Sequence, residues 1–225
     1  MQRLRIHENV YTSEEIIVMK KFSLSTLSVL GVCALFLATA NAGPLSVGNG
    51  KTFHEIFPGF KVQNRTNAPL AQRYTNVGGV ITTTVFAGEQ RVELRWDSFP
   101  NEHTFNQFEA DMQFDAGTQH TAIHQIKSNT AHEPVYIQVN TPGTIRNGVG
   151  PTLATGLAGK WFHVNSAYNP ATRQYFLWIN GSLVSHGIHN DVGFDFYFKN
   201  GTYNNGLPPG GRSRAMFKNI HHYSQ

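Results

Sequence analysis

The chain has 225 residues, of which 40% are hydrophobic and 14% charged, and its formal net charge is +4 at pH 7. It contains no run of basic residues, which excludes a typical nucleic-acid-binding protein, whereas a mild positive balance suits a polyanionic partner. Once the N-terminal region is set aside, the remaining length is enough for one well-buried domain but not for two ordinary ones.

The N-terminal region has the pattern of a secretory signal peptide. An apolar run, residues 22–40, follows two lysines. It leads into the small-x-small triplet Ala-Asn-Ala, which ends at Ala42. The run is short and contains several Ser and Thr residues, which argues against a membrane anchor. We expect residues 1–42 to be an upstream extension plus a signal peptide, and residues 43–225 to be a mature domain. The protein is then secreted, extracellular or periplasmic, with no membrane contact after the signal is removed.

The cysteine count limits the chemistry of the mature domain. Cys33 is the only cysteine, and it lies inside the predicted signal peptide. We therefore expect no disulfide and no cysteine-ligated metal in the mature protein. The sequence also lacks a visible cluster of metal ligands, so we predict no metal and no other cofactor.

Alternating apolar and polar residues dominate the chain after residue 60, a period typical of half-buried strands. Asn180-Gly181, between two apolar runs, predicts a two-residue hairpin. Stretches rich in Pro, Gly and Asn at 140–152 and 204–212 predict long loops. Many short strands separated by turns predict an all-β sandwich or barrel. The expected strands are 80–86, 91–96, 105–114, 121–127, 135–139, 161–168, 175–179 and 194–199.

The first segment with candidate chemistry is the strand RVELRW. At a period of two residues, Arg91, Glu93 and Arg95 share one face, and the apolar residues between them share the other. The charged face presents two guanidinium groups with a carboxylate between them. This pattern is compatible with an anion-binding site and equally with a solvated face of paired charges.

The second segment is IHQIK. Ile123, Gln125 and Lys127 are expected on one face, whereas His124 and Ile126 are expected toward the core. A glutamine beside a lysine can bind and neutralise a carboxylate. The alternative interpretation is ordinary surface polarity.

The third segment is YFKNGTYN. Tyr197 and Lys199 share the face opposite the neighbouring phenylalanines, and Gly201 permits a turn that would bring Tyr203 back over that face. The alternative interpretation is a strand end with an aromatic rim.

Together the three segments resemble the signature blocks of the family 7 polysaccharide lyases, the alginate lyase superfamily. That family carries R-x-E-L-R, Q-I-H and Y-F-K-x-G-x-Y-N-Q blocks, and this sequence has RVELR, HQIK and YFKNGTYNN in the same order. The resemblance covers roughly residues 85–223. It implies a β-sandwich of the concanavalin-like jelly-roll type, with two antiparallel sheets and a substrate groove. Lys127 stands where the family has a histidine, and Asn205 where it has a glutamine.

The resemblance implies a secreted polysaccharide lyase that cleaves a polyuronate, alginate or a related glycan, by β-elimination at C5 and O4. Such an enzyme must neutralise the uronate carboxylate before the C5 proton can leave. Arg95 and Gln125 are the candidates for this role, and Tyr203 is the candidate acid and also a candidate base. If the base is a histidine, His103 is the first choice. The remaining candidates for substrate binding are Arg91, Glu93, Lys127, Lys199 and Tyr197.

Other functions fit parts of the sequence. Glu109 and Asp111 resemble the E-x-D-x-x-E strand of laminarinase-type hydrolases, but the third carboxylate is replaced at Phe114. A glucuronan lyase on the same fold is another alternative, since Lys127 breaks the family pattern. A third is a non-catalytic carbohydrate-binding jelly-roll domain, because fold alone does not decide function. For each of these functions we expect a monomer that binds a glycan. If the protein is a lyase, that glycan is an anionic polysaccharide.

Overall fold

The computed structural model describes residues 43–130, 133–190 and 192–225. The predicted upstream extension and signal peptide, residues 1–42, lie outside the described residues. Within the described part, regular structure consists of fifteen strands and one short 3-10 helix, η1 (Leu70–Gln72). No helix among these residues is long and apolar enough to cross a membrane.

Eight strands form one antiparallel sheet. They follow the order β13-β12-β11-β6-β15-β4-β3, and β1 pairs with β15 outside this path. Their bounds are β1 (His54–Ile56), β3 (Tyr74–Val77), β4 (Val80–Phe86), β6 (Asn106–Phe114), β11 (Phe162–Asn169), β12 (Gln174–Ile179), β13 (Ser182–Ile188) and β15 (Arg212–Ser224).

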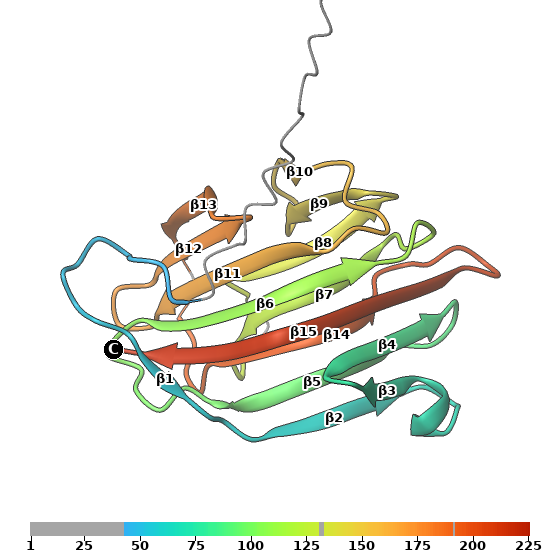
Figure 1. Cartoon of the computed structure of the whole chain (residues 1–225), viewed down its shortest axis with the longest axis horizontal. Coiled ribbons are helices and arrows are strands. Elements are labelled where there is room, and N and C mark those ends of the chain that lie inside the picture. The colour runs from blue at the N-terminus through green and yellow to red at the C-terminus, as the bar shows by residue number, and fades with distance from the viewer. Residues whose placement is uncertain (1–42, 131–132, 191) are drawn as a thin grey trace, which may run out of the picture. The chain divides into compact units, whose positions relative to one another are not determined.

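The other seven strands form a second antiparallel sheet with the order β10-β9-β8-β7-β14-β5-β2. Figure 1 shows the two sheets stacked as layers. The fold is thus an all-β jelly-roll sandwich, as expected. The bounds in this sheet are β2 (Phe60–Arg65), β5 (Arg91–Ser98), β7 (Thr121–Lys127), β8 (Val135–Thr141), β9 (Thr144–Asn147), β10 (Thr152–Ala154) and β14 (Tyr197–Asn204).

The main core lies between the two sheets and takes every second residue from each strand. Leu94, Ile126 and Phe198 come from the seven-stranded sheet, and Phe108 and Phe217 come from the eight-stranded sheet; all are at most 2% exposed. Each such side chain contributes about 1.5–3 kcal/mol by leaving water. This burial fixes which face of each strand remains available for a site.

The local predictions mostly agree with the structure. Asn180 and Gly181 form the predicted hairpin turn between β12 and β13, with φ values of 51° and 77° that such turns require. The predicted loop at 140–152 is wrong in part, because it contains β9 as a short pairing strand. The predicted turn at Gly201 is also wrong, since β14 continues through this residue to Asn204.

The face predicted for Ile123 needs a correction. The pairing between β7 and β8 shifts register between Ala122 and His124. This irregularity turns Ile123 into the core, where it is 1% exposed. Gln125 and Lys127, beyond the irregularity, keep their predicted face.

Candidate active site

The three predicted segments lie side by side on the outward face of the seven-stranded sheet. β14 is the central strand, with β5 on one side and β7 on the other. Lys199 of β14 lies opposite both Arg95 and Gln125, and Tyr203 lies opposite Arg91. The pairing explains why residues separated by more than 100 positions share one surface.

A cavity of about 340 Å³ opens on this face. Three of the predicted residues that line it, Arg91, Gln125 and Tyr203, come from three different strands, and Lys127 also contributes. Three further residues complete the lining: Asn205, which replaces the glutamine of the third block, and Glu133 and Tyr136, which the sequence did not indicate as site residues. In β8, Tyr136 lies between two buried residues and is itself partly exposed. The alternation in the sequence could therefore have indicated that its side chain faces outward.

A buried ion pair supports the floor of the cavity. The Glu93 carboxylate accepts hydrogen bonds from Gln125 Nε2 at 2.5 Å and from Lys199 Nζ at 2.6 Å, and Arg91 Nη1 lies 3.5 Å away. Burial lowers the pKa of Lys199, although attraction to Glu93 opposes the shift. The side chains of Glu93 and Lys199 are each 1% exposed. Both residues were predicted to bind substrate, but they lie beneath the cavity and do not line it; Glu93 contacts Gln125 and Arg91 instead.

Two tyrosines stand in different surroundings at the cavity. The Arg91 guanidinium lies 4.6 Å from the centre of the Tyr203 ring. Tyr136 donates a hydrogen bond from its hydroxyl to Asn205 Oδ1 at 2.8 Å. Burial raises the pKa of Tyr136. The two phenols thus differ in their neighbours: Tyr203 lies beside a guanidinium, and Tyr136 is bound to an amide.

Lys127 occupies the position of the histidine in the resembling family, and it is paired. Its ammonium lies 2.5 Å from Glu133 Oε1 and donates to the carbonyl of Thr130 at 3.2 Å. Glu133 thus offsets much of the charge that Lys127 brings to the cavity. Arg91 also lines the cavity. Among the described residues, it pairs with one carboxylate, that of Glu93, and it shares this partner with Lys199.

Arg95 lies outside this cavity, contrary to the predicted role in neutralising the carboxylate. Its guanidinium stacks 4.1 Å above the ring of Tyr197 and lies 3.8 Å from Asp195 Oδ2. Arg95 and Arg91 are four residues apart on β5, about 13 Å along the strand. Arg91 is thus the arginine of β5 that lines the cavity, whereas Arg95 and Tyr197 do not line it.

His103 is also far from Tyr203. It belongs to the connection between β5 and β6, where the neighbouring Glu102 carboxylate accepts a hydrogen bond from the amide of Phe196 at 2.7 Å. Phe196 directly precedes β14, whereas Tyr203 lies near the other end of that strand, about 20 Å away. The structure does not bring His103 to the cavity.

The buried histidines do not supply a base either. His124 packs against Phe108 and accepts or donates at Ser166 Oγ, 2.7 Å from its Nε2. Burial lowers the pKa of His124 to about 3, so the ring is neutral, and it faces the core as predicted. Within the described residues, none of the cavity's lining side chains is a histidine.

Gly201 allows the close approach of β14 and β5 at the site. A Cβ added there would overlap the carbonyl oxygen of Val92 and lie 2.6 Å from Cα of Glu93. Any larger residue would push β5 away and move Glu93 from Lys199. The glycine is thus required for strand contact, not for the turn expected from the sequence.

We predict that Gly201→Ala lowers the free energy of unfolding by about 3 kcal/mol, as overpacking between strands does. Urea unfolding followed by fluorescence measures the effect. Gly117→Ala is the matched control, because an added Cβ at Gly117 meets nothing within 4 Å. Equal midpoints for the two variants would contradict the close-contact explanation.

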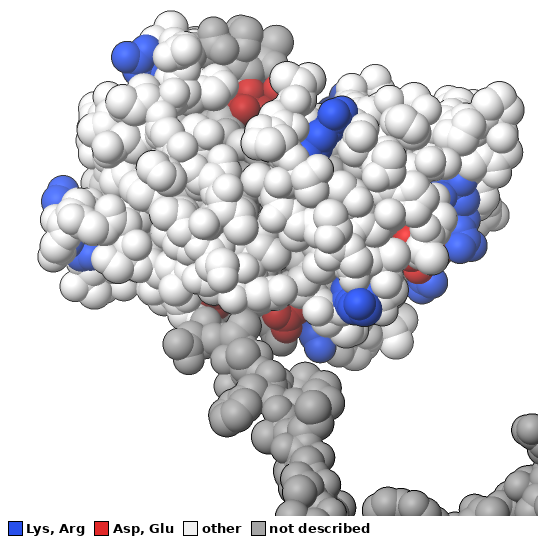
Figure 2. All heavy atoms as spheres, turned by 90° about the horizontal axis from the view of Figure 1, so that it is seen from above, with Lys and Arg blue, Asp and Glu red and all other residues white. Residues whose placement is uncertain are grey.

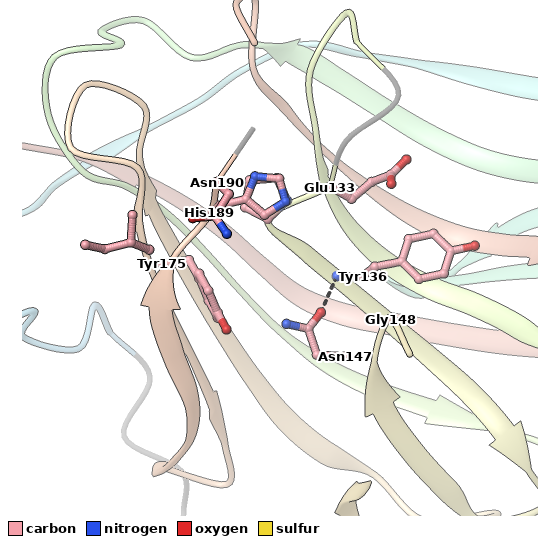
Figure 3. Close-up of a pocket in the computed structure, with 9 residues that line it drawn as sticks. Glu133, Tyr136, Asn147, Gly148, Tyr175, His189 and Asn190 are labelled. Carbon is pink, nitrogen blue, oxygen red and sulfur yellow. Dashed lines mark hydrogen bonds between the residues drawn. The ribbon is translucent and has the colours of Figure 1, made fainter. Parts of the chain in front are cut away.

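A second cavity of about 310 Å³ adjoins the first and shares Glu133 and Tyr136 with it (Figure 3). Asn147 accepts a hydrogen bond from the Tyr136 amide at 2.7 Å, and Tyr175 and His189 lie across from it. The two adjoining cavities are together called the groove below. No Lys or Arg is among the described residues that line the second cavity.

The hydrolase alternative is not supported by position. Glu109 and Asp111 lie on β6 of the eight-stranded sheet, on the face away from the main core, and not in the groove. Glu109 is 1% exposed. A pair of carboxylates that flanks a scissile bond must be accessible within the groove.

The face shown in Figure 2 does not carry one continuous basic patch. In the view of Figure 2, the Lys and Arg side chains are separated by broad uncharged areas instead of forming one basic patch. Among the described residues there is no group of three or more His, Cys, Asp or Glu that could hold a metal ion.

No family model and no curated protein matches the sequence. Solved structures do match the fold. Alginate lyase A1-II′, a member of polysaccharide lyase family 7, has a TM-score of 0.59 at 14% identity, over 74% of this chain and 94% of that one. An alginate lyase from Pseudomonas aeruginosa has a TM-score of 0.56 at 19% identity, over 74% and 98%.

A sialidase also matches, with a TM-score of 0.56 at 11% identity, over 72% of this chain but only 16% of its own length. A shared jelly roll therefore does not determine activity. The two lyase matches described above instead extend over nearly the whole length of the matched proteins. The described domain has the jelly-roll fold of the alginate lyases of polysaccharide lyase family 7.

Proposed function

We propose that the protein is a secreted polysaccharide lyase that cleaves a polyuronate by β-elimination. One observation carries the proposal: Arg91, Gln125 and Tyr203, from three separate strands, line a single cavity. A carbohydrate-binding domain needs aromatic platforms and hydrogen bonds, but it does not need a phenol beside a guanidinium over a buried ion pair. The lyase-like fold supports the same function.

The first requirement of the reaction is to neutralise the uronate carboxylate, so that the negative charge developing at C5 can delocalise into it. Arg91 offers a planar pair of donors that matches a carboxylate. Gln125 donates one Nε2 hydrogen to Glu93, and the second hydrogen of that amide group remains available for the substrate. Glu93 thereby holds both side chains in position.

The second requirement is proton transfer at two atoms. We assign both transfers to Tyr203: its phenolate takes the C5 proton, the C4–O4 bond breaks, and the resulting phenol protonates O4. The enzyme returns to its starting charge, and the product carries a C4–C5 double bond. The Arg91 guanidinium over the ring stabilises a phenolate electrostatically.

The substrate follows from the charges of the groove. Lys127 is bound to Glu133, so the cavity presents one strong carboxylate site, centred on Arg91. Alginate or a related polyuronate fits this site. Glucuronan is the main alternative, since Lys127 replaces the histidine of the alginate lyase block. We further propose that the protein acts as a secreted monomer.

The direct experiment incubates the mature domain with polymannuronate, polyguluronate and glucuronan while the ultraviolet absorbance of the new double bond is followed. We expect absorbance to rise with at least one of these polymers. Binding without any rise on all three would favour a carbohydrate-binding domain. New reducing ends without absorbance would favour a hydrolase.

A further inference from the structure

A second group of buried polar residues lies on the outward face of the eight-stranded sheet, away from the groove. Its centre is Glu109, which is 1% exposed. The carboxylate accepts hydrogen bonds from Tyr223 Oη at 2.9 Å, Asn165 Nδ2 at 3.0 Å and the backbone nitrogen of Gly43 at 3.0 Å. The proposed reaction uses none of these residues.

The segment that begins at Gly43 is held firmly over this face. Leu45 donates its amide to Gln107 Oε1 at 2.7 Å, and Gln107 Nε2 donates to the Leu45 carbonyl at 3.0 Å. Leu45 and Val47 then pack against a small apolar cluster that includes Trp178. These contacts fix the nitrogen of Gly43 beside Glu109.

Two carboxylates share one imidazole at the centre of the cluster. His163 lies between two carboxylates, 3.7 Å from Glu109 and 2.9 Å from Asp111. Burial disfavours the imidazolium, but the two carboxylates outweigh burial and raise the pKa of His163. Burial also opposes ionisation of Glu109, but His163, Tyr223, Gly43 and Asn165 together hold its pKa below the usual range. One imidazolium can balance only one of the two carboxylates.

We infer that proteolytic removal of residues 1–42 creates an ammonium group at Gly43 that binds Glu109 and completes this cluster. Water adds across the Ala42–Gly43 peptide bond: the hydroxyl joins the Ala42 carbonyl carbon, and the released Gly43 amine takes up protons to become –NH₃⁺. A neutral amide donor to a buried carboxylate is thereby replaced by a cation, which adds direct attraction between opposite charges to the existing hydrogen bond. Export and folding stability are coupled in this way.

The test compares three chains that are identical from Gly43 onward: one that starts at Gly43, the same chain with its amine acetylated, and one that starts at Ala42. Acetylation keeps an N–H donor at Gly43 but removes the charge. We expect the free Gly43 chain to have a urea midpoint higher than the other two by roughly 0.5–1 M. Equal midpoints for the free and the acetylated chains would overturn the inference.

Glu109→Gln in each of the three chains completes the design. We expect this substitution to remove the difference between the chains, and a difference that persists would show that the ammonium does not act through Glu109. If Glu109→Gln does not fold, the acetylation pair alone decides. Sequencing of the exported protein should give Gly43 as the first residue, and another start would equally overturn the inference. None of these outcomes depends on lyase activity.

Discussion

Replacement of Tyr203 by phenylalanine is expected to reduce the formation of unsaturated ends by about 10³-fold or more. The proposed reaction uses the Tyr203 hydroxyl twice, to take the C5 proton and to protonate O4, and each positioned proton transfer contributes roughly 10²–10⁴-fold. The phenylalanine ring still lies under the Arg91 guanidinium, so the packing of the cavity is retained. Initial rates of absorbance increase on the best polymer measure the loss.

Tyr74→Phe is the matched control, because it removes a phenolic hydroxyl from β3, in the other sheet. Its activity should remain within twofold of the unaltered protein. Binding of an oligouronate to Tyr203→Phe, measured by calorimetry, should persist because Arg91 and Gln125 are intact. If Tyr203→Phe retained most of its activity, Tyr203 would have no part in the reaction and the base would have to be sought elsewhere.

The second large effect concerns the two arginines of β5. We expect Arg91→Ala to lower kcat/KM by about 10²–10³-fold, the usual loss when a donor to developing negative charge is removed. Arg91 lines the cavity with Tyr203, whereas Arg95 stacks on Tyr197 outside it. Arg95→Ala should therefore cost less than tenfold, mainly through weaker binding of long polymers.

Steady-state kinetics on a polymer and on a short oligouronate separate these outcomes. Loss of activity on both substrates in Arg91→Ala, with a small effect of Arg95→Ala on the polymer only, agrees with the assignment. If Arg95→Ala had the larger effect on kcat/KM, Arg95 and not Arg91 would be the residue that neutralises the carboxylate. Urea unfolding of both variants excludes a trivial loss of structure, which matters because Arg91 lies 3.5 Å from the buried Glu93.

The sequence predicts the faces of the strands well because strand periodicity depends only on local alternation. Arg91 and Gln125 were therefore placed on outward faces without knowledge of the fold. Tyr203 was expected on the same surface through a turn at Gly201, whereas in the structure β14 simply continues to it. Their order along the chain does not reveal strand pairing. Only the register, with Tyr203 opposite Arg91 and Lys199 opposite Arg95, decides which arginine lies at the cavity.

Other features depend on contacts that no local pattern encodes. Ile123 turns inward because the β7–β8 pairing shifts, and Gly201 is required by its distance to β5. Tyr136 has a visible strand period, but its place at the cavity follows from β8 lying next to β7. His103 lies in a loop, where sequence gives no direction at all.

The buried pair of Glu93 and Lys199 has a consequence for how sequence motifs of this kind are interpreted. Removal of one partner alone leaves an isolated charge in the protein interior, which typically costs about 3–5 kcal/mol. Descendants that had lost all enzymatic activity would still need both residues, or would have to exchange them together. The glutamate and lysine of such motifs thus reflect a constraint on folding, and only the cavity-lining residues Arg91, Gln125 and Tyr203 can report on chemistry.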